Sequence, residues 1–207
     1  MGKDEVRSMD TCEAVSDFDR VLTDRAFHIG YMQGSEKVLF IKGGQGGSIY
    51  GYRNRYLDLA ASVRRKYGCS VFVAATSEDD KASHDGEMRT VRELVNDPAY
   101  RIYYLGISKG GLIGCWYGAD EPRIRRIVTV NAPLMINFHN RTRPALKKLT
   151  GDRLTMVYGS RDPSYPYIPF VRNCAAVRIL DGAGHNLENS PVSLSALVEE
   201  LLLFDLR

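Results

Sequence analysis

Residues 103–114 read YYLGISKGGLIG. An apolar, aromatic run stops at Gly106, Ser108 follows after one intervening residue, and glycines then open an apolar stretch with helical spacing. This order is typical of a strand, a tight turn and a helix, with the serine hydroxyl at the apex of the turn. The G-x-S-x-G pattern alone is weak because only three positions are fixed, so the rest of the chain has to support it.

Short apolar runs and helical patterns alternate along the chain around this segment. Strands are predicted at 26–31 (an edge strand), 37–41, 70–75, 101–105, 126–130, 154–158 and 176–180. Helices are predicted at 52–67, around 88–95, at 109–117 and 144–149, and from Ser190-Pro191 onward. Such alternation predicts right-handed crossovers between parallel strands. The expected fold class is α/β: three layers, with a mostly parallel, twisted sheet and helices on both of its faces.

Length and composition favour one domain of ordinary balance, with 207 residues, 44% hydrophobic and 26% charged. We expect a polar N-terminal tail or short helix over 1–25 and a single domain over 26–207. The net charge of +3 is spread among acids and bases, so we expect no nucleic-acid partner. The sequence has no membrane-length apolar run, signal-peptide pattern or metal-binding cysteine spacing, which predicts a cytoplasmic protein without a metal.

Chemistry-bearing residues follow four of the predicted strands. They are the glycine-rich loop 43–47, Ser108, Asp162 and His185. Because the carboxyl ends of parallel strands meet at one edge of a sheet, we expect these four sites to lie close together.

A serine hydroxyl needs a base within hydrogen-bond reach to act as a nucleophile. Of the four histidines, His28 falls in the edge strand, and His84 and His139 fall in loops where a plain surface role is favoured. His185 lies in a glycine-rich turn after the last strand, which allows a sharp loop over the sheet edge. His185 is therefore the predicted base for Ser108.

The histidine in turn needs a carboxylate that orients its ring. Asp162 follows the 154–158 strand by a short loop and is the predicted acid. Asp181 suits a turn beside the histidine loop, and Asp152 precedes its strand and so belongs to the opposite edge. The other workable location for an acid, after the 126–130 strand, holds Asn131.

The glycine-rich loop suits an oxyanion hole, in which backbone N–H groups bind the charge that develops on a carbonyl oxygen. The expected donors are the N–H groups of Lys109 and of Gly44 or Gln45. A dinucleotide-binding motif would need glycine where Ile49 stands, and the Gly-Lys-Ser/Thr ending of a phosphate-binding P-loop is absent.

Together these motifs resemble the α/β-hydrolases of the serine type over residues 26–207. The matching segments are the elbow 106–110, the acid loop 159–162, the histidine loop 182–185 and the glycine loop 42–47. The chain order serine, aspartate, histidine is the one that this family uses. Two features depart from it: Lys42 stands where many members have histidine, and the interval of about 131–152, where relatives often insert a lid, is short.

The resemblance implies a serine hydrolase that cleaves a carboxylic ester or a related small acyl compound, without a cofactor. An acyl thioesterase and a non-catalytic binding protein on the same fold are the alternatives. Tyr50 and Tyr52 follow the glycine loop, and Tyr165 and Tyr167 follow Asp162. These tyrosines are candidates for the wall of a substrate pocket, with Tyr50, Tyr165 and Tyr167 preferred, and plain surface positions are the alternative.

Overall fold

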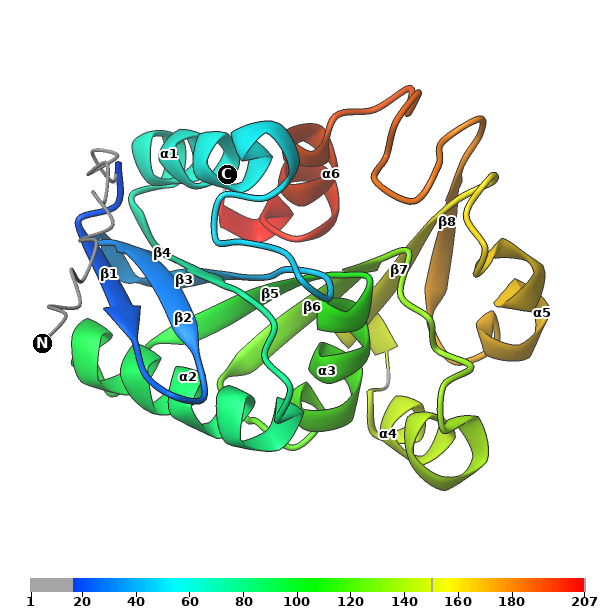
Figure 1. Ribbon diagram of the computed structural model, residues 1–207, viewed down its shortest axis with the longest axis horizontal. Helices are drawn as coiled ribbons and strands as arrows, with labels where there is room; N and C mark the ends of the chain where they lie inside the picture. The colour runs from blue at the N-terminus through cyan, green and yellow to red at the C-terminus, as the bar shows by residue number, and fades with distance from the viewer. Residues whose placement is uncertain (1–16, 150, 207) are drawn as a thin grey trace, which may run out of the picture.

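The computed structural model describes residues 17–149 and 151–206, and it contains an eight-stranded sheet (Figure 1). The order of strands across the sheet is β1-β2-β4-β3-β5-β6-β7-β8. β2 pairs antiparallel with β1 and β4, and the other neighbouring pairs are parallel. The strands are β1 Arg20–Thr23, β2 His28–Met32, β3 Ser35–Lys42, β4 Cys69–Ala74, β5 Arg101–Ile107, β6 Ile124–Val130, β7 Leu154–Gly159 and β8 Ala176–Leu180.

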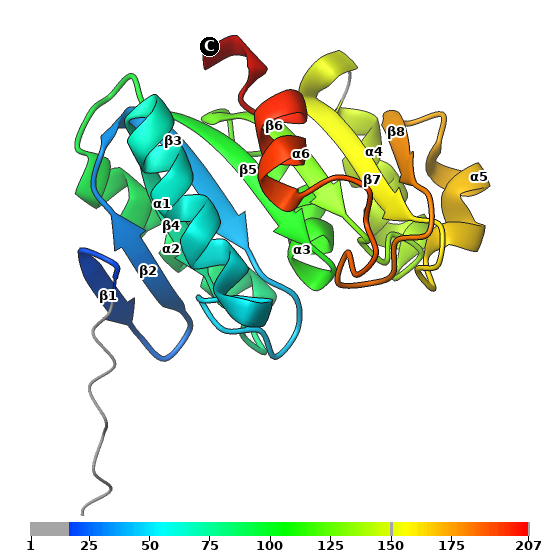
Figure 2. The same cartoon turned by 90° about the horizontal axis from the view of Figure 1, so that it is seen from above.

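Helices cover both faces of this sheet, which confirms the predicted three-layer α/β architecture (Figures 1 and 2). Helices α1 (Arg55–Tyr67) and α6 (Leu194–Leu201) pack on one face. On the other face lie α2 (Asp80–Val95), α3 (Lys109–Gly118) and α4 (Arg143–Lys148), while α5 (Ile168–Val171) lies near β8. Within the described ranges, no helix has the length and apolarity needed to span a membrane.

The alternation of side chains along β3 explains how the sheet supports two hydrophobic layers. Val38 and Phe40 belong to the layer under α2 and α3, whereas Leu39 and Ile41 belong to the layer under α1 and α6. All four side chains are fully buried. A strand covered on both faces reads as a continuous apolar run, which is why this strand was predictable from its sequence.

Four predictions of secondary structure need correction. Helix α2 begins at Asp80, well before the predicted helix of about 88–95, and Asp79 caps it by accepting a hydrogen bond from the N–H of Ala82. Residues 20–23 form the edge strand β1, where a tail or short helix was predicted. The strand predicted at the edge, 26–31, therefore corresponds to β2, which lies inside the sheet between β1 and β4. Residues 1–16 of the predicted tail fall outside the described residues. Helix α6 begins after Ser193, whose hydroxyl accepts a hydrogen bond from the N–H of Ala196, because Ser190 instead closes a local turn with Val192. Helix α5 was not predicted.

The N-terminus of α3 packs unusually closely on the ends of β3 and β5. A Cβ atom added to Gly110 would lie 2.2 Å from the carbonyl oxygen of Lys42 and 2.5 Å from that of Gly43. Neither oxygen can move without displacing the end of β3. Position 110 therefore needs glycine because a side chain would clash with backbone, and not because of its φ angle.

Gly110→Ala should lower the free energy of unfolding by about 3 kcal/mol or more, because the added methyl group meets backbone. Alanine is otherwise the better helix former by about 1 kcal/mol, so the sign of the effect is informative. Urea denaturation measures it. Gly118→Ala is the control, because its methyl group meets only the ends of the Ile124 and Ile127 side chains. An equal effect of the two substitutions would contradict the close contact with β3.

Candidate active site

Ser108 lies at the apex of the turn between β5 and α3. Its φ and ψ angles are 51° and −120°, a conformation that is costly for a residue with a side chain. The turn is held by a 2.8 Å hydrogen bond from the Ser108 N–H to the carbonyl of Val130. A Cβ atom on Gly106 would lie 2.5 Å from the Cα atom of Gly111, so the glycines allow the strand and the helix to approach each other.

The loops after β7 and β8 bring Asp162 and His185 to this turn, as predicted from the sequence. His185 Nε2 lies 3.1 Å from the Ser108 hydroxyl oxygen, and His185 Nδ1 is hydrogen-bonded to the carboxylate of Asp162. Asp162 is only 3% exposed, and its second oxygen accepts a 2.7 Å hydrogen bond from the N–H of Ser164. The three side chains therefore form one hydrogen-bonded chain.

The charges and hydrogen bonds around His185 favour its protonated form. The hydrogen bond to Asp162 raises the pKa of His185 above its ordinary value, against the opposing effects of partial burial and of the Arg55 charge. Burial disfavours the ionised form of Asp162, but its hydrogen bonds from His185 and Ser164 outweigh burial and lower the pKa of the carboxyl group. The site is thus built to stabilise an imidazolium beside a carboxylate.

The glycine loop after β3 lies directly beside Ser108. A Cβ atom on Gly44 would lie 3.2 Å from that of Ser108 and 3.7 Å from its hydroxyl oxygen. Gly43 ties the loop to the end of β4: its N–H donates to Ala74, and its carbonyl accepts from the hydroxyl of Thr76. At the first position of α3, the N–H of Lys109 has no acceptor within the helix. Gly44 and the N-terminus of α3 therefore lie beside Ser108, where a substrate carbonyl oxygen would have to bind.

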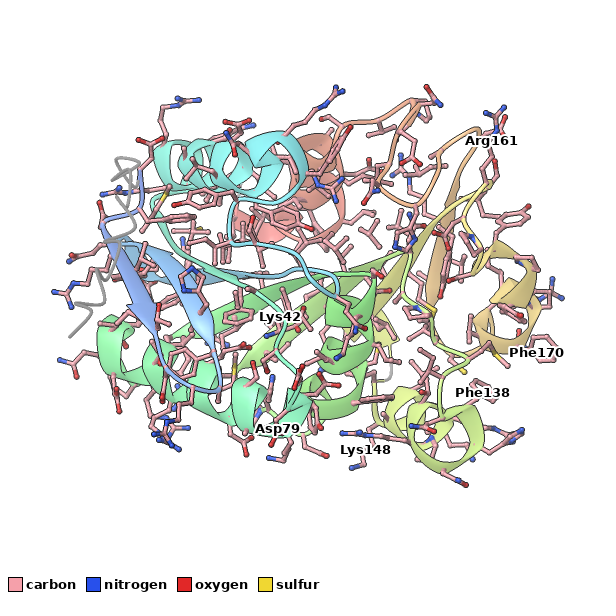
Figure 3. The ribbon with its side chains drawn as sticks, viewed as in Figure 1. Lys42, Asp79, Phe138, Lys148, Arg161 and Phe170 are labelled. Atoms are coloured by element: carbon pink, nitrogen blue, oxygen red, sulfur yellow. The ribbon has the colours of Figure 1, made fainter. Side chains whose placement is uncertain are left out.

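Lys42, the residue that departs from the pattern implied by the resemblance, is fully buried at the end of β3 (Figure 3). Its ammonium group donates to the carbonyl of Ala75 at 2.8 Å and to the hydroxyl of Ser83 at 3.1 Å, and it forms an ion pair with Glu87. The Ser83 hydroxyl also donates to Glu87. Burial raises the pKa of Glu87, which the ion pair with Lys42 opposes. This network joins the end of β3, the end of β4 and helix α2.

Lys42→Met should lower the free energy of unfolding by about 3–5 kcal/mol, because it leaves the Glu87 carboxylate buried without a cation. Without Lys42, the pKa of Glu87 in the folded state lies above its unfolded value, so the deficit grows as pH rises. Urea denaturation at several pH values measures both effects. Lys42→Met/Glu87→Met should come within about 2 kcal/mol of the wild type. A double variant as unstable as the single one would show that the unpaired charge is not the cause.

Asn131, which from the sequence is notable only as the residue at the other workable position for an acid, has a supporting role that was not predicted. Its side chain is fully buried at the end of β6 and links the two loops that carry Asp162 and His185. The amide nitrogen donates to the carbonyls of Gly184 at 3.1 Å and His185 at 2.8 Å, and the amide oxygen accepts from the N–H of Gly159 at 2.8 Å. A carboxylate here would face two carbonyl oxygens without a proton to donate, which explains why an asparagine suits this position.

The competing candidates lie elsewhere. His28 contacts Thr23 on the edge strand, and His139 is exposed. The predicted loop position of His84 is wrong: His84 lies in helix α2 and is buried against Tyr117, and burial lowers its pKa to about 4. Asp181 accepts a hydrogen bond from Ser160, and Asp152 forms an ion pair with Arg126 before β7 begins. Among the described residues, no group of three or more histidine, cysteine, aspartate or glutamate side chains is arranged to hold a metal ion.

A cavity of about 510 Å³ opens beside Ser108 and His185. Glycine-loop residues line one side and Tyr52, Arg55, Tyr56 and Asn186 line another. The predicted wall residues Tyr50, Tyr165 and Tyr167 are not among its lining residues. Tyr50 packs against the core near Phe18, Tyr165 packs on the opposite hydrophobic layer, and Tyr167 is exposed. Of the tyrosines that follow the functional loops, Tyr52 does line the cavity.

The segment between β6 and β7 does not reach this cavity, since none of its described residues lines it. It contains a single turn of π-helix, Phe138–Thr142, followed by α4. Thr142 accepts a 2.9 Å hydrogen bond from the indole N–H of Trp116 in α3, and the buried side chains of Ala145 and Leu146 join the core. The segment is therefore attached to α3.

No protein-family model matches this chain, and no curated protein is similar to it in sequence. Solved structures do match. Est1E from Butyrivibrio proteoclasticus is 13% identical, with a TM-score of 0.66 over 90% of this chain and 97% of that one. An α/β serine hydrolase without a lid from Xanthomonas campestris is 14% identical (TM-score 0.60; 87% and 91% of the two chains). The esterase domain of a Rhodothermus marinus protein is 12% identical (TM-score 0.60; 84% and 88%). The chain therefore has the α/β-hydrolase fold.

Proposed function

We propose that this protein is a serine hydrolase that cleaves a carboxylic ester through an acyl-enzyme on Ser108. The observation that carries the proposal is the hydrogen-bonded chain from Ser108 through His185 to Asp162, with the serine on a strained turn. Two of the structures that share the fold are named as a serine hydrolase and an esterase domain, which supports this class of reaction.

In the first half of the proposed reaction, the Ser108 hydroxyl oxygen attacks the ester carbonyl carbon while His185 Nε2 takes the hydroxyl proton. Asp162 holds the ring in the tautomer that leaves Nε2 free to accept, and it stabilises the imidazolium. The N–H groups of Lys109 and of Gly44 or Gln45 bind the oxyanion. The imidazolium then gives its proton to the departing alcohol.

In the second half, His185 removes a proton from a water molecule that attacks the acyl carbon. The imidazolium then gives this proton to the Ser108 oxygen as the bond between that oxygen and the acyl carbon breaks, and the acid is released. The same oxyanion donors serve this second tetrahedral intermediate. The reaction needs no metal or organic cofactor, and its partner is a small acyl compound. An acyl thioesterase would use the same residues, and a non-catalytic binding protein would leave them idle.

A fluorophosphonate probe tests whether Ser108 is an activated nucleophile. The wild type should be labelled at Ser108, and Ser108→Ala should abolish the labelling. Ser48→Ala is the matched control, because Ser48 lines the same cavity without a histidine partner in the described structure, and its labelling should equal that of the wild type. Absence of labelling in the correctly folded wild type would leave the binding-protein alternative.

Asp162→Asn should lower turnover of an ester by roughly 10⁴-fold, because the asparagine favours the wrong histidine tautomer. In the wild type, kcat/KM should rise with pH as His185 loses its proton. Since the hydrogen bond to Asp162 raises the pKa of His185, this rise lies above the ordinary histidine value, and Asp162→Asn should move it to lower pH. Steady-state kinetics across pH measure both changes.

Asp181→Asn is the control for this experiment, because Asp181 belongs to the same loop region but contacts Ser160 and not His185. It should leave turnover and the pH profile as in the wild type. Equal losses from the two substitutions would assign the effect to loop structure and contradict the role of Asp162.

A further inference from the structure

The cavity beside Ser108 has few aliphatic side chains in its lining. Apart from glycines, the proposed catalytic residues and two tyrosines, its lining side chains are Gln45, Ser48, Arg55, Ile107 and Asn186. Ile107 is the single aliphatic side chain among these described residues. A long alkyl chain would gain little from this surface, because the free energy of apolar binding scales with the apolar area that is covered.

Arg55 supplies the permanent charge of this cavity. One guanidinium nitrogen donates to the backbone carbonyl of Asn186, and the other lies 3.5 Å from the hydroxyl of Tyr56. No carboxylate in the described part of the chain forms an ion pair with Arg55. A half-buried arginine beside a reactive serine therefore keeps an uncompensated positive charge.

A second cavity, of about 530 Å³, continues from the first and shares Tyr52, Arg55 and Asn186 with it. Two arginines, Arg53 and Arg55, and one acid, Glu188, are its charged lining residues. The Glu188 carboxylate already accepts a hydrogen bond from the N–H of Asn186. The balance of charge around the two cavities is thus positive, and it is centred on Arg55.

We propose that the substrate is an ester that carries a carboxylate, and that Arg55 binds this carboxylate while Ser108 attacks the ester carbonyl. This inference deepens the proposed hydrolase function and rests on it. A carboxylate fits better than a doubly charged phosphate for two reasons. Part of the donor capacity of Arg55 is already used by Asn186, and Glu188 would repel a second negative charge.

The test compares two p-nitrophenyl esters of equal shape: the hemiglutarate, and its analogue with an isopropyl group in place of the carboxylate. The wild type should hydrolyse the hemiglutarate with a kcat/KM at least tenfold higher than its kcat/KM for the neutral analogue. Arg55→Gln should lower kcat/KM for the hemiglutarate on the order of tenfold to a hundredfold, the range expected for a charge-assisted hydrogen bond. The loss for the neutral ester should be smaller, because it reflects only the lost hydrogen bond to the Asn186 carbonyl beside His185.

The neutral ester reports any disturbance of the histidine loop, since Arg55 also holds the backbone beside His185. Arg55→Lys keeps the charge and should retain most of the preference, whereas Arg53→Gln, at the outer cavity, should change it little. Equal losses for the two esters in Arg55→Gln, or a wild type that prefers the neutral ester, would overturn the inference.

Calorimetry on Ser108→Ala separates this inference from the proposed function. That variant should bind the hemiglutarate ester at least tenfold more tightly than the neutral analogue, and the additional Arg55→Gln substitution should remove the difference. Selective binding without turnover by the wild type would refute the hydrolase and retain the carboxylate site. Turnover without selectivity would refute the carboxylate site alone.

Discussion

The close packing of α3 against β3 and β5 is the constraint on which the rest of the site depends. The backbone of α3 approaches the carbonyls at the end of β3 so closely that only glycine fits at position 110, and a second glycine at 106 lets the helix pass over β5. This approach leaves Ser108 with a positive φ angle and its hydroxyl above the sheet edge. The same approach sets the glycine loop beside that hydroxyl, because the loop begins where β3 ends.

Buried polar side chains hold the loops around Ser108 in place. Lys42 secures the glycine loop from below through Ala75, Ser83 and Glu87, and Asn131 joins the acid loop to the histidine loop. Such groups stabilise a structure only when their hydrogen bonds are satisfied, so they also restrict the arrangements that the loops can adopt. Rigid support of this kind helps to keep Ser108, His185 and Asp162 within hydrogen-bonding distance of one another.

Local sequence patterns predicted most of the strands and helices, and the incorrect predictions have physical causes. Buried parallel strands read as apolar runs, and G-x-S-x-G between a strand and a helix indicated the elbow. The edge strand β1 has mostly exposed side chains, so its pattern differs little from that of a polar tail. The start of α6 was placed too early because Ser190 and Ser193 offer similar capping chemistry, and only the path of the chain selects Ser193.

The sequence by itself determined which strand ends carry reactive groups, since strand order along the chain and the rule for parallel sheets place Ser108, Asp162 and His185 at one edge. Only the tertiary structure decided what supports and surrounds them. The contacts of Lys42, Asn131 and Arg55 join segments that lie between 45 and 131 residues apart in the chain, and no local pattern encodes contacts over such separations. Folding also places Arg55, the first residue of α1, in the wall of the cavity beside Ser108, which the helical pattern of this segment does not indicate.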